Sequence, residues 1–287
     1  MSSYRFCRTD DIGLLVDALN RCWLPYFPDQ GAITTASFKR SIRDLQVWCS
    51  SCMVAFSGSD PIGVLIGAKR PSGTLVHKIA VHPDHRRQGH GRHLLASLGS
   101  KLSILGPPKI VAEVPEHLAA ACGLFRACEY VEEAVLTDYV LEGPAPSEHK
   151  DTTRVEGFVI PITIDDLAAN GLLEEAHSQT CWERSMATLI ARKADIAGLA
   201  VVSDERIEAY LLYVARGDET EIVSLRCSIE DGGARLRQLL AQLRAQGTDI
   251  FRLPKVHAGE ISKEWLETLG FRAAGRHRLY AATARAA

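Results

Sequence analysis

Residues 76–98, VHKIAVHPDHRRQGHGRHLLASL, decide the fold of this chain. The first six residues are mostly apolar and predict a short strand, and Pro83 marks its end because proline cannot donate to a central ladder. A basic loop with two glycines follows the strand. Three leucines then recur at the i, i+1, i+4 spacing of a helix. The stretch therefore predicts a strand, a glycine-containing loop and a helix, in that order.

The loop has the chemistry of an anion site. Gly89 and Gly91 lack a Cβ atom and let the backbone come close to a ligand. The first turn of the following helix offers unpaired N–H groups and the positive end of its dipole. Arg86, Arg87 and Arg92 add full positive charges at the rim. Together these features predict a site for a pyrophosphate group.

The spacing of these residues resembles that of a known superfamily. It is neither a P-loop nor a G-x-G-x-x-G loop, because Leu94 stands three residues after Gly91. Arg86, Gly89 and Gly91 match the R/Q-x-x-G-x-G/A loop of the GNAT superfamily of acyl-CoA-dependent N-acetyltransferases. The resemblance covers residues 3–142. It implies transfer of an acetyl (acyl) group from acetyl-CoA, as cosubstrate, to a primary amine by direct attack in a ternary complex.

Composition sets the broad class of the protein. The 287 residues are 46% hydrophobic and 24% charged, as in ordinary globular proteins, and suffice for one large domain or two of typical size. A net charge of −2 argues against a nucleic-acid partner. We expect neither a membrane anchor nor a signal peptide, because no apolar run approaches ~20 residues and no apolar segment follows a basic start. These features predict a cytoplasmic protein.

The spacing of cysteines and histidines predicts no metal site. The C-x-x-C pair, Cys49 and Cys52, leads into a predicted strand instead of opening a helix, and no second pair completes a zinc site. We therefore expect reduced, packed thiols. Three arginines beside the clustered histidines of the opening stretch disfavour a bound cation. These histidines are His77, His82, His85, His90 and His93.

The first half of the chain alternates strands and helices. The order of predicted elements, β-α-α-β-β-β-α-β-α-β, indicates an α/β layered domain with a mixed sheet and agrees with the GNAT fold. Asp10 or Asp11 is the expected cap of the first helix. The predicted strands cover residues 4–8, 53–57, 62–68, 76–81, 109–114 and 134–141, and the later helices cover 35–45, the leucine-rich stretch after Gly91 and 116–127.

A polar stretch with two prolines, residues 143–153, predicts a linker, and the order of elements then repeats in residues 154–287. We expect a strand over 155–162, a helix from Asp165 or Asp166 to Ala176, and a further helix over 182–191. The leucine-rich LLAQL of the second half echoes LLASL of the first. The sequence thus predicts two tandem GNAT-like domains, 1–142 and 154–287, each a mixed, mostly antiparallel sheet flanked by helices.

The second copy of the loop, residues 227–234, differs in charge. It keeps its glycines but places Glu230 and Asp231 where a pyrophosphate needs cations. We therefore expect a degenerate domain that does not bind CoA in the usual way, and one CoA per chain. Such a domain would buttress the first domain, wall the acceptor cleft or form a homodimer.

The resemblance also implies residue roles in the first domain. The backbone of Ile79, Ala80 and Val81 would pair with the pantetheine arm, and one of these N–H groups would face the thioester carbonyl. Trp23, Tyr26 and Phe27 would shape the acceptor pocket. The pyrophosphate loop would consist of Arg86, Arg87, Gln88, Gly89, His90, Gly91 and Arg92.

Two residues are candidates for the general base. His77 alternates with Ile79 and Val81, which predicts that the three share a face of their strand, and its imidazole titrates near neutrality. Glu113 lies on the next predicted strand, and many relatives use a strand glutamate. Both stay open as candidates.

The general acid departs from the family pattern. Relatives carry tyrosine in L-Y-x-x-x-G-F, whereas Phe125 stands at that position, and Leu118 replaces the usual asparagine. Cys122, Tyr139 or water could supply the proton, or the thiolate could leave unaided. An alternative function follows: a non-catalytic module that binds acyl-CoA as a sensor or scaffold.

Overall fold

The computed structural model describes residues 2–143, 157–173, 180–204 and 206–285. The predicted linker from residue 144 onward, the start of the strand predicted at 155, and the predicted helix end at Ala176 lie outside these residues. The chain divides into two compact units. Unit 1 comprises Met1–Ala134 and Arg278–Ala287, and unit 2 comprises Val135–His277.

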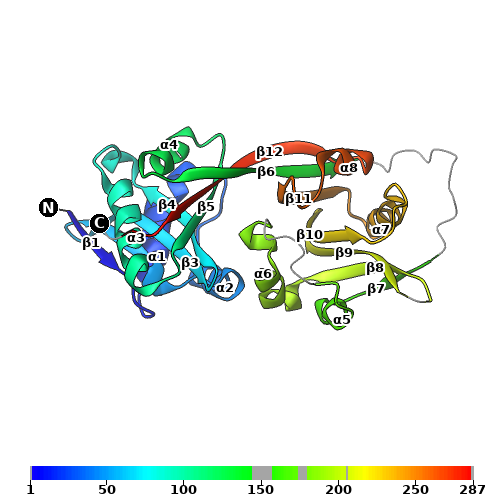
Figure 1. Cartoon of the computed structure of the whole chain (residues 1–287). Coiled ribbons are helices and arrows are strands. Elements are labelled where there is room, and N and C mark those ends of the chain that lie inside the picture. The colour runs from blue at the N-terminus through cyan, green and yellow to red at the C-terminus, as the bar shows by residue number, and fades with distance from the viewer. Residues whose placement is uncertain (1, 144–156, 174–179, 205, 286–287) are drawn as a thin grey trace. The chain divides into compact units, whose positions relative to one another are not determined.

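Unit 1 is a mixed sheet with helices on both faces (Figure 1). The second helix covers the predicted residues, while the first helix begins after Asp11, whose carboxylate pairs with Arg5 and makes no capping hydrogen bond. The helices are α1 (Ile12–Cys22), α2 (Thr35–Leu45), α3 (His90–Leu105) and α4 (Ala119–Ala127). The strands are β1 (Ser2–Phe6), β2 (Met53–Ser57), β3 (Asp60–Arg70), β4 (Gly73–Val81) and β5 (Lys109–Pro115), with parts of β6 (Val131–Glu142) and β12 (Arg272–Thr283).

The last strand of the chain completes the sheet of unit 1. The strand order in this unit is β1-β2-β3-β4-β5-β12-β6, so β12 lies between β5 and β6. The unit boundaries fall inside β6, after Ala134, and inside β12, before Arg278. The predicted boundary after residue 142 therefore differs from the division of the structure. The two halves of the sequence have similar element orders. A repeat of this kind does not reveal that unit 1 includes part of β12 from the second half, or that unit 2 includes part of β6 from the first half.

The core of unit 1 fixes the sheet against α3 and α4. Leucines at helical spacing on α3, among them Leu94 and Leu98, pack with Ile110 of β5 and Phe125 of α4. Tyr280 of β12 is fully buried in the same core. The side chains of this core come from distant parts of the sequence. Their burial together holds α3, and the loop that precedes it, at the end of β4.

Unit 2 repeats this architecture with the order β7-β8-β9-β10-β11-β6-β12. Thr163, not Asp165 or Asp166, caps the first helix, because its hydroxyl accepts the N–H of Asp166. The helix predicted over 182–191 is split at Ser185, whose backbone is extended. The strands are β7 (Phe158–Pro161), β8 (Ala197–Val202), β9 (Ile207–Arg216), β10 (Glu219–Cys227) and β11 (Ile250–His257); the helices are α5 (Ile164–Ala169), α6 (Met186–Ala191), α7 (Ala234–Ala245) and α8 (Lys263–Thr268).

Among the described residues, each unit is thus a mostly antiparallel sheet that includes a parallel pair, β4–β5 in unit 1 and β10–β11 in unit 2. The predicted architecture, a mixed and mostly antiparallel sheet flanked by helices in each unit, is confirmed. No helix in the described part of the chain has the length and apolar character needed to cross a membrane.

Candidate functional site

The parallel strands β4 and β5 separate at one end. Within these described strands, pairing is confined to Thr74–Ile110 and Leu75–Val111, although β4 continues to Val81 and β5 to Pro115. On its other edge, β4 stays paired with β3 as far as Val81. The β5-facing edge of β4 beyond Leu75 is therefore a strand edge that can pair with an extended ligand.

A β-bulge at His77 interrupts β4 in this region. Ile66 is opposite Lys78 and Gly67 is opposite Val76, so His77 is the extra residue. Val76 and Ile79, three residues apart, both pack against the α3 core. The simple alternation that placed His77 with Ile79 and Val81 on one face therefore does not hold through this stretch.

The loop after β4 ends in a helix N-terminus that no described side chain caps. A 3-10 turn, η3 (Pro83–His85), is followed by Arg87 and Gly89, both in the left-handed region with φ of 63° and 87°. The N–H of His93 is the first to bond back into α3, to the carbonyl of Gly89 at 3.0 Å. The N–H groups of the first turn are thus available to an anion, as the sequence predicts.

The two glycines of the loop do different work. Gly89 has a positive φ and open space where a Cβ would stand, so its role is to set the backbone and leave room in front of it. A Cβ on Gly91 would lie 3.0 Å from Leu124 of α4. Gly91 therefore permits close packing of α3 on α4. The position of its missing Cβ faces Leu124, so the expectation that this missing Cβ makes room for a ligand is wrong.

The charged side chains around the loop have protein partners as well. The guanidinium of Arg86 lies 5.3 Å from the ring centroid of Tyr26. Burial raises the pKa of the Cys128 thiol, and the neighbouring Arg92 opposes that rise. Arg86 and Arg92 thus have protein neighbours of different kinds, the Tyr26 ring and the Cys128 thiol.

The His90 ring is buried and faces the protein. Its Nδ1 lies 2.6 Å from the Tyr4 hydroxyl, and burial, with His85 and His93 nearby, lowers the pKa of the imidazole. A neutral, buried ring adds no charge to an anion site. The contribution of His90 to the predicted loop is therefore its backbone N–H.

The three aromatic residues predicted for the acceptor pocket gather beside β4. The Tyr26 hydroxyl donates to the Val81 carbonyl at 2.6 Å. Trp23 stacks on Phe27 with a centroid separation of 4.5 Å, and the Nζ of Lys78 lies 4.5 Å from the Trp23 ring. The segment after α1 is thus fixed to the same stretch of β4 that separates from β5.

The two predicted bases lie where β4 and β5 separate. His77 stands two residues after the last paired residue of β4, and Glu113 stands two residues after Val111 of β5. Both are half-buried. Neighbours of Glu113 on its strand, Ala112 and Val114, pack against α3 and α4, so Glu113 lies on the opposite face of the sheet.

Two departures from the family pattern, Phe125 and Leu118, lie in or next to α4. Phe125 is buried in the core, and Leu118 precedes the helix without a side-chain capping hydrogen bond. Tyr139, one predicted substitute acid, packs in the core of unit 2. Cys122 donates to the Pro115 carbonyl at 3.8 Å, and Tyr280 stacks on Phe125. Sequence reasoning missed Tyr280 because its strand was assigned to the second domain.

In unit 2, the loop before α7 is filled by its own carboxylate. Asp231 accepts the N–H groups of Gly233, Ala234 and Arg235 at 2.8, 3.1 and 2.9 Å. The Arg235 side chain bridges Asp231 and Glu208. Burial favours protonation of Asp231, but these hydrogen bonds outweigh it and lower the pKa of the carboxyl. The anion at the N-terminus of α7 is thus the Asp231 carboxylate of the chain itself.

Neither the cysteines nor the histidines form a metal centre in the described residues, where no cluster of three or more His, Cys, Asp or Glu side chains is suited to a metal ion. Cys49 and Cys52 are buried and not disulfide-bonded, and burial raises the pKa of both thiols. His82 and His85 make a ring contact at 6.0 Å beside the loop.

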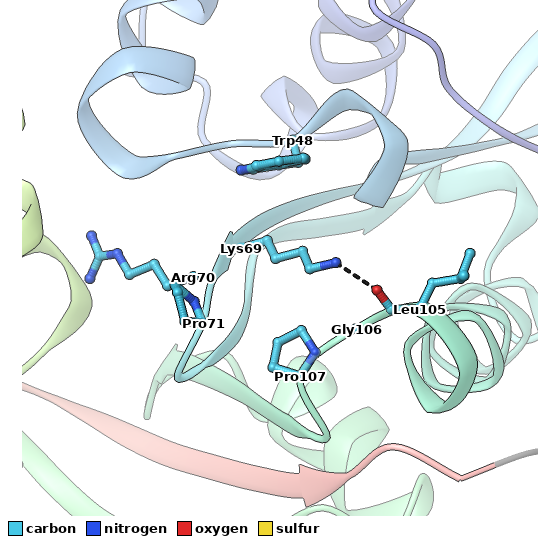
Figure 2. A pocket seen from close by; sticks show the side chains of 7 residues that line it. All are labelled: Trp48, Lys69, Arg70, Pro71, Leu105, Gly106 and Pro107. Atoms are coloured by element: carbon cyan, nitrogen blue, oxygen red, sulfur yellow. Dashed lines mark hydrogen bonds between the residues drawn. The ribbon is translucent and has the colours of Figure 1, made fainter.

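A separate groove of about 330 Å³ lies at the other end of α3 (Figure 2). Lys69 donates to the carbonyl of Leu105, the last residue of α3, at 2.9 Å and lies 5.9 Å from the Trp48 ring. A helix of this length spans about 24 Å, which separates the groove from the loop at His90. The groove is therefore distinct from the predicted site.

Comparison with known proteins defines the class. Residues 14–130, all of them in unit 1, match the model of the acetyltransferase (GNAT) family. Family and fold together support acyl transfer from acetyl-CoA as the general chemistry of this domain.

Solved structures match the whole chain. It is similar to a GCN5-related N-acetyltransferase from Sphaerobacter thermophilus, with 14% identity, a TM-score of 0.69, and 99% of this chain and 96% of that one covered. A tandem GNAT protein from the clavulanic acid biosynthesis pathway has 15% identity, a TM-score of 0.68 and 99% coverage of both chains. A putative acetyltransferase from Pyrococcus horikoshii has 16% identity, a TM-score of 0.63, and 99% and 90% coverage. At these identities the likeness shows the tandem fold.

Proposed function

We propose that unit 1 binds acetyl-CoA and transfers its acetyl (acyl) group to a primary amine. One observation carries the proposal: β4 separates from β5 after Leu75, and the loop that follows β4, residues 82–89, ends at the uncapped N-terminus of α3. A strand edge followed by a loop and a helix N-terminus suits a ligand with an amide-containing arm and a diphosphate. The match of residues 14–130 to the GNAT family supports the same ligand.

The residues of unit 1 fit this cosubstrate. The N–H groups of residues 88–92 would hold the pyrophosphate, with Arg86 and Arg87 exposed at the rim. The backbone of Ile79, Ala80 and Val81 would pair with the pantetheine arm. Acetyl-CoA supplies an activated thioester, and the chain supplies orientation and proton transfer.

His77 and Glu113 are the proposed bases. Both stand at the start of the separation between β4 and β5. A base here would take a proton from the ammonium form of the acceptor, which leaves a nucleophilic amine. The amine nitrogen then forms a bond to the thioester carbon, the carbon–sulfur bond breaks, and the sulfur leaves with the electron pair.

Trp23, Tyr26 and Phe27 would border the acceptor. They lie beside β4, and Tyr26 is anchored on the Val81 carbonyl. The acceptor class that we propose is a small molecule or a peptide with a primary amine. Unit 2 would act as a structural partner for this reaction, because Asp231 fills its loop.

A purified-protein assay tests the proposal. Acetyl-CoA should raise the melting temperature, and an amine panel should release free thiol from acetyl-CoA at a rate above that of hydrolysis. Failure of acetyl-CoA to stabilise the protein would contradict both binding and transfer.

The non-catalytic alternative rests on Phe125, which is buried and has no hydroxyl at the position of the family acid. A sensor or scaffold module would show stabilisation by acetyl-CoA without thiol release for any amine. The same two measurements therefore separate an enzyme from a binding module.

A further inference from the structure

The hydrogen bonds of β4 show which of its backbone groups face the open edge. The N–H of His82 donates to the carbonyl of Ile62 at 2.8 Å, and in the same antiparallel register Val81 is opposite Gly63 of β3. Opposed residues of an antiparallel pair alternate between those that exchange hydrogen bonds and those that do not. Val81 therefore directs its N–H and C=O away from β3, to the edge where β4 has separated from β5.

The same alternation divides the proposed pantetheine stretch. Ile79 also directs its N–H and C=O to the open edge, whereas Ala80 directs its own to β3. Between the bulge at His77 and the loop, the open edge thus carries the polar groups of Ile79 and Val81. The last of them along the strand is the carbonyl of Val81, where β4 ends.

This last carbonyl is occupied by a side chain. The hydroxyl of Tyr26 donates to it at 2.6 Å. Tyr26 is the last residue of the 3-10 turn η1 (Leu24–Tyr26), and its side chain is half-buried. Burial raises the pKa of the hydroxyl, which keeps its proton at neutral pH. The open edge therefore offers a ligand the N–H and C=O of Ile79 and the N–H of Val81, while the carbonyl beside the loop is closed.

The closed carbonyl suits the chemistry of the proposed cosubstrate. The arm of CoA contains amides, which both donate and accept hydrogen bonds, but the diphosphate that follows the arm has acceptor oxygens and negative charge. A backbone carbonyl left open beside a diphosphate would repel it and lose its own hydrogen bond. The Tyr26 hydroxyl supplies the proton that a phosphate lacks, and the N–H of Val81 stays available to the anion.

The ring of Tyr26 makes a second contact, with the loop. The guanidinium of Arg86 lies 5.3 Å from the ring centroid, within the range of a cation–π interaction. The Arg86 side chain is exposed, and a long exposed side chain loses rotamer freedom when it binds an anion. A ring that restricts the side chain beforehand reduces that loss. Tyr26 thus contacts both the end of the strand and a cation of the loop.

We propose that Tyr26 is a cosubstrate-binding residue, an inference that rests on the proposed function. Its hydroxyl closes the Val81 carbonyl toward the diphosphate, and its ring holds Arg86 beside the same group. Tyr26 therefore serves the cosubstrate as well as the border of the acceptor pocket. Trp23 and Phe27, which stack on each other at 4.5 Å, serve the acceptor.

Two replacements separate the hydroxyl from the ring. Tyr26→Phe keeps the ring and removes the donor, whereas Tyr26→Leu removes both. In calorimetric titrations with acetyl-CoA, Kd should rise about fivefold in the first variant and about 20-fold in the second, as expected for one hydrogen bond and for that bond with a cation–π contact. Phe27→Leu is the matched control, because it removes a ring from the same segment, and its Kd should equal that of the wild type.

A double-mutant cycle tests the contact between the ring and the loop. Arg86→Gln should by itself raise Kd for acetyl-CoA. If the Tyr26 ring holds Arg86, Tyr26→Leu should cost about threefold less in the Arg86→Gln background than in the wild type. Tyr26→Phe keeps the ring and should cost the same factor in both backgrounds. Fully additive losses for Tyr26→Leu and Arg86→Gln would contradict the role of the ring.

Phosphorus NMR of bound acetyl-CoA locates the effect independently of affinity. At saturating ligand, the diphosphate signals should shift between the wild type and Tyr26→Phe, because the polar surroundings of this group change. In Phe27→Leu the same signals should stay in place. Diphosphate signals that are identical in the wild type and Tyr26→Phe would contradict the role of the hydroxyl.

The result for the wild type separates this inference from the function on which it rests. Wild-type binding of acetyl-CoA, with the same Kd in Tyr26→Phe and Tyr26→Leu, would overturn the role of Tyr26 and leave the proposed function intact. A wild type that does not bind acetyl-CoA contradicts the proposed function itself. Should Tyr26→Leu fail to fold, Kd and the phosphorus spectrum of Tyr26→Phe decide the inference.

Discussion

The carboxylate of Asp231 accepts the backbone N–H of Gly233 at 2.8 Å, in the loop that corresponds by sequence repeat to the uncapped loop before α3. Gly233 and Gly89 both precede their helices with left-handed backbones, at φ of 85° and 87°. The two loops thus share a backbone design. They differ in that the loop of unit 2 contains its own anion, the Asp231 carboxylate.

Replacement of Asp231 by Asn should destabilise the protein. The change removes the negative charge and one of the two acceptor oxygens at the start of α7, where the carboxylate accepts three N–H groups and pairs with Arg235, and loss of a hydrogen bond to a charged group costs about 1.5–3 kcal/mol of the free energy of unfolding. Chemical denaturation at pH 7 measures it. Glu230→Gln, an exposed neighbour in the same loop, is the matched control and should have no effect.

The pKa of Asp231 is lowered in the fold, so its contribution to stability has a defined pH dependence. The contribution is complete above the unfolded-state pKa of about 4 and disappears as the pH falls through the lower folded-state value. The difference between wild type and Asp231→Asn should therefore shrink in acid. A difference that persists unchanged at the lowest pH would contradict the capping role.

Gly89→Ala should weaken acetyl-CoA binding. A side chain at φ of 87° is strained by about 1–2 kcal/mol, and the first turn of α3 relieves that strain by moving its N–H groups. We expect Kd to rise by about tenfold or more, which corresponds to about 1.4 kcal/mol. Gly99→Ala is the control: it lies within the same helix with open space around its Cβ position, and it should bind normally. Equal binding by both variants would show that the Gly89 backbone is not part of the site.

His90 should make the protein less stable below neutral pH. Because its pKa is lowered in the fold, the unfolded chain takes up a proton first as the pH falls below about 6.5. The melting temperature of the wild type should therefore drop between pH 7 and pH 5 more than that of His90→Gln. The exposed His117→Gln should keep the wild-type slope. A slope in His90→Gln equal to that of the wild type would assign the pH dependence elsewhere.

Unit 1 should require the last strand of the chain. Residues 1–142 alone lack β12, which carries Tyr280 into the core, so this fragment should neither unfold cooperatively nor bind acetyl-CoA. Co-expression with a peptide that covers residues 272–285 should restore both properties. A scrambled peptide of the same composition is the control. A fragment of residues 1–142 that melts cooperatively by itself would contradict the assignment of β12 to this unit.

Local chemistry explains what the sequence predicts well. The strand, loop and helix around Gly89 follow from short-range patterns, and the α2 bounds follow from its Thr34 cap and apolar spacing. Long-range relations are different. The bulge at His77 depends on pairing with β3, and the place of β12 depends on its neighbours β5 and β6, which are far away from it in the chain. No local pattern encodes either.

The same distinction holds for the candidate site. Residue spacing predicted the loop, and the family resemblance predicted the aromatic cluster of Trp23, Tyr26 and Phe27; each lies within a short segment. It could not give the separate roles of Gly89 and Gly91, since the second depends on Leu124 of another helix. It also could not give the buried hydroxyl of Tyr280, since stacking on Phe125 joins opposite ends of the chain.

Calorimetric titration of acetyl-CoA into the whole chain tests the central claim most directly. We predict one site per chain, which persists in Asp231→Asn and is weakened by about tenfold or more in Gly89→Ala. Two sites per chain, no binding, or a single site that is lost in Asp231→Asn and unchanged in Gly89→Ala would contradict the placement of acetyl-CoA on the loop of unit 1.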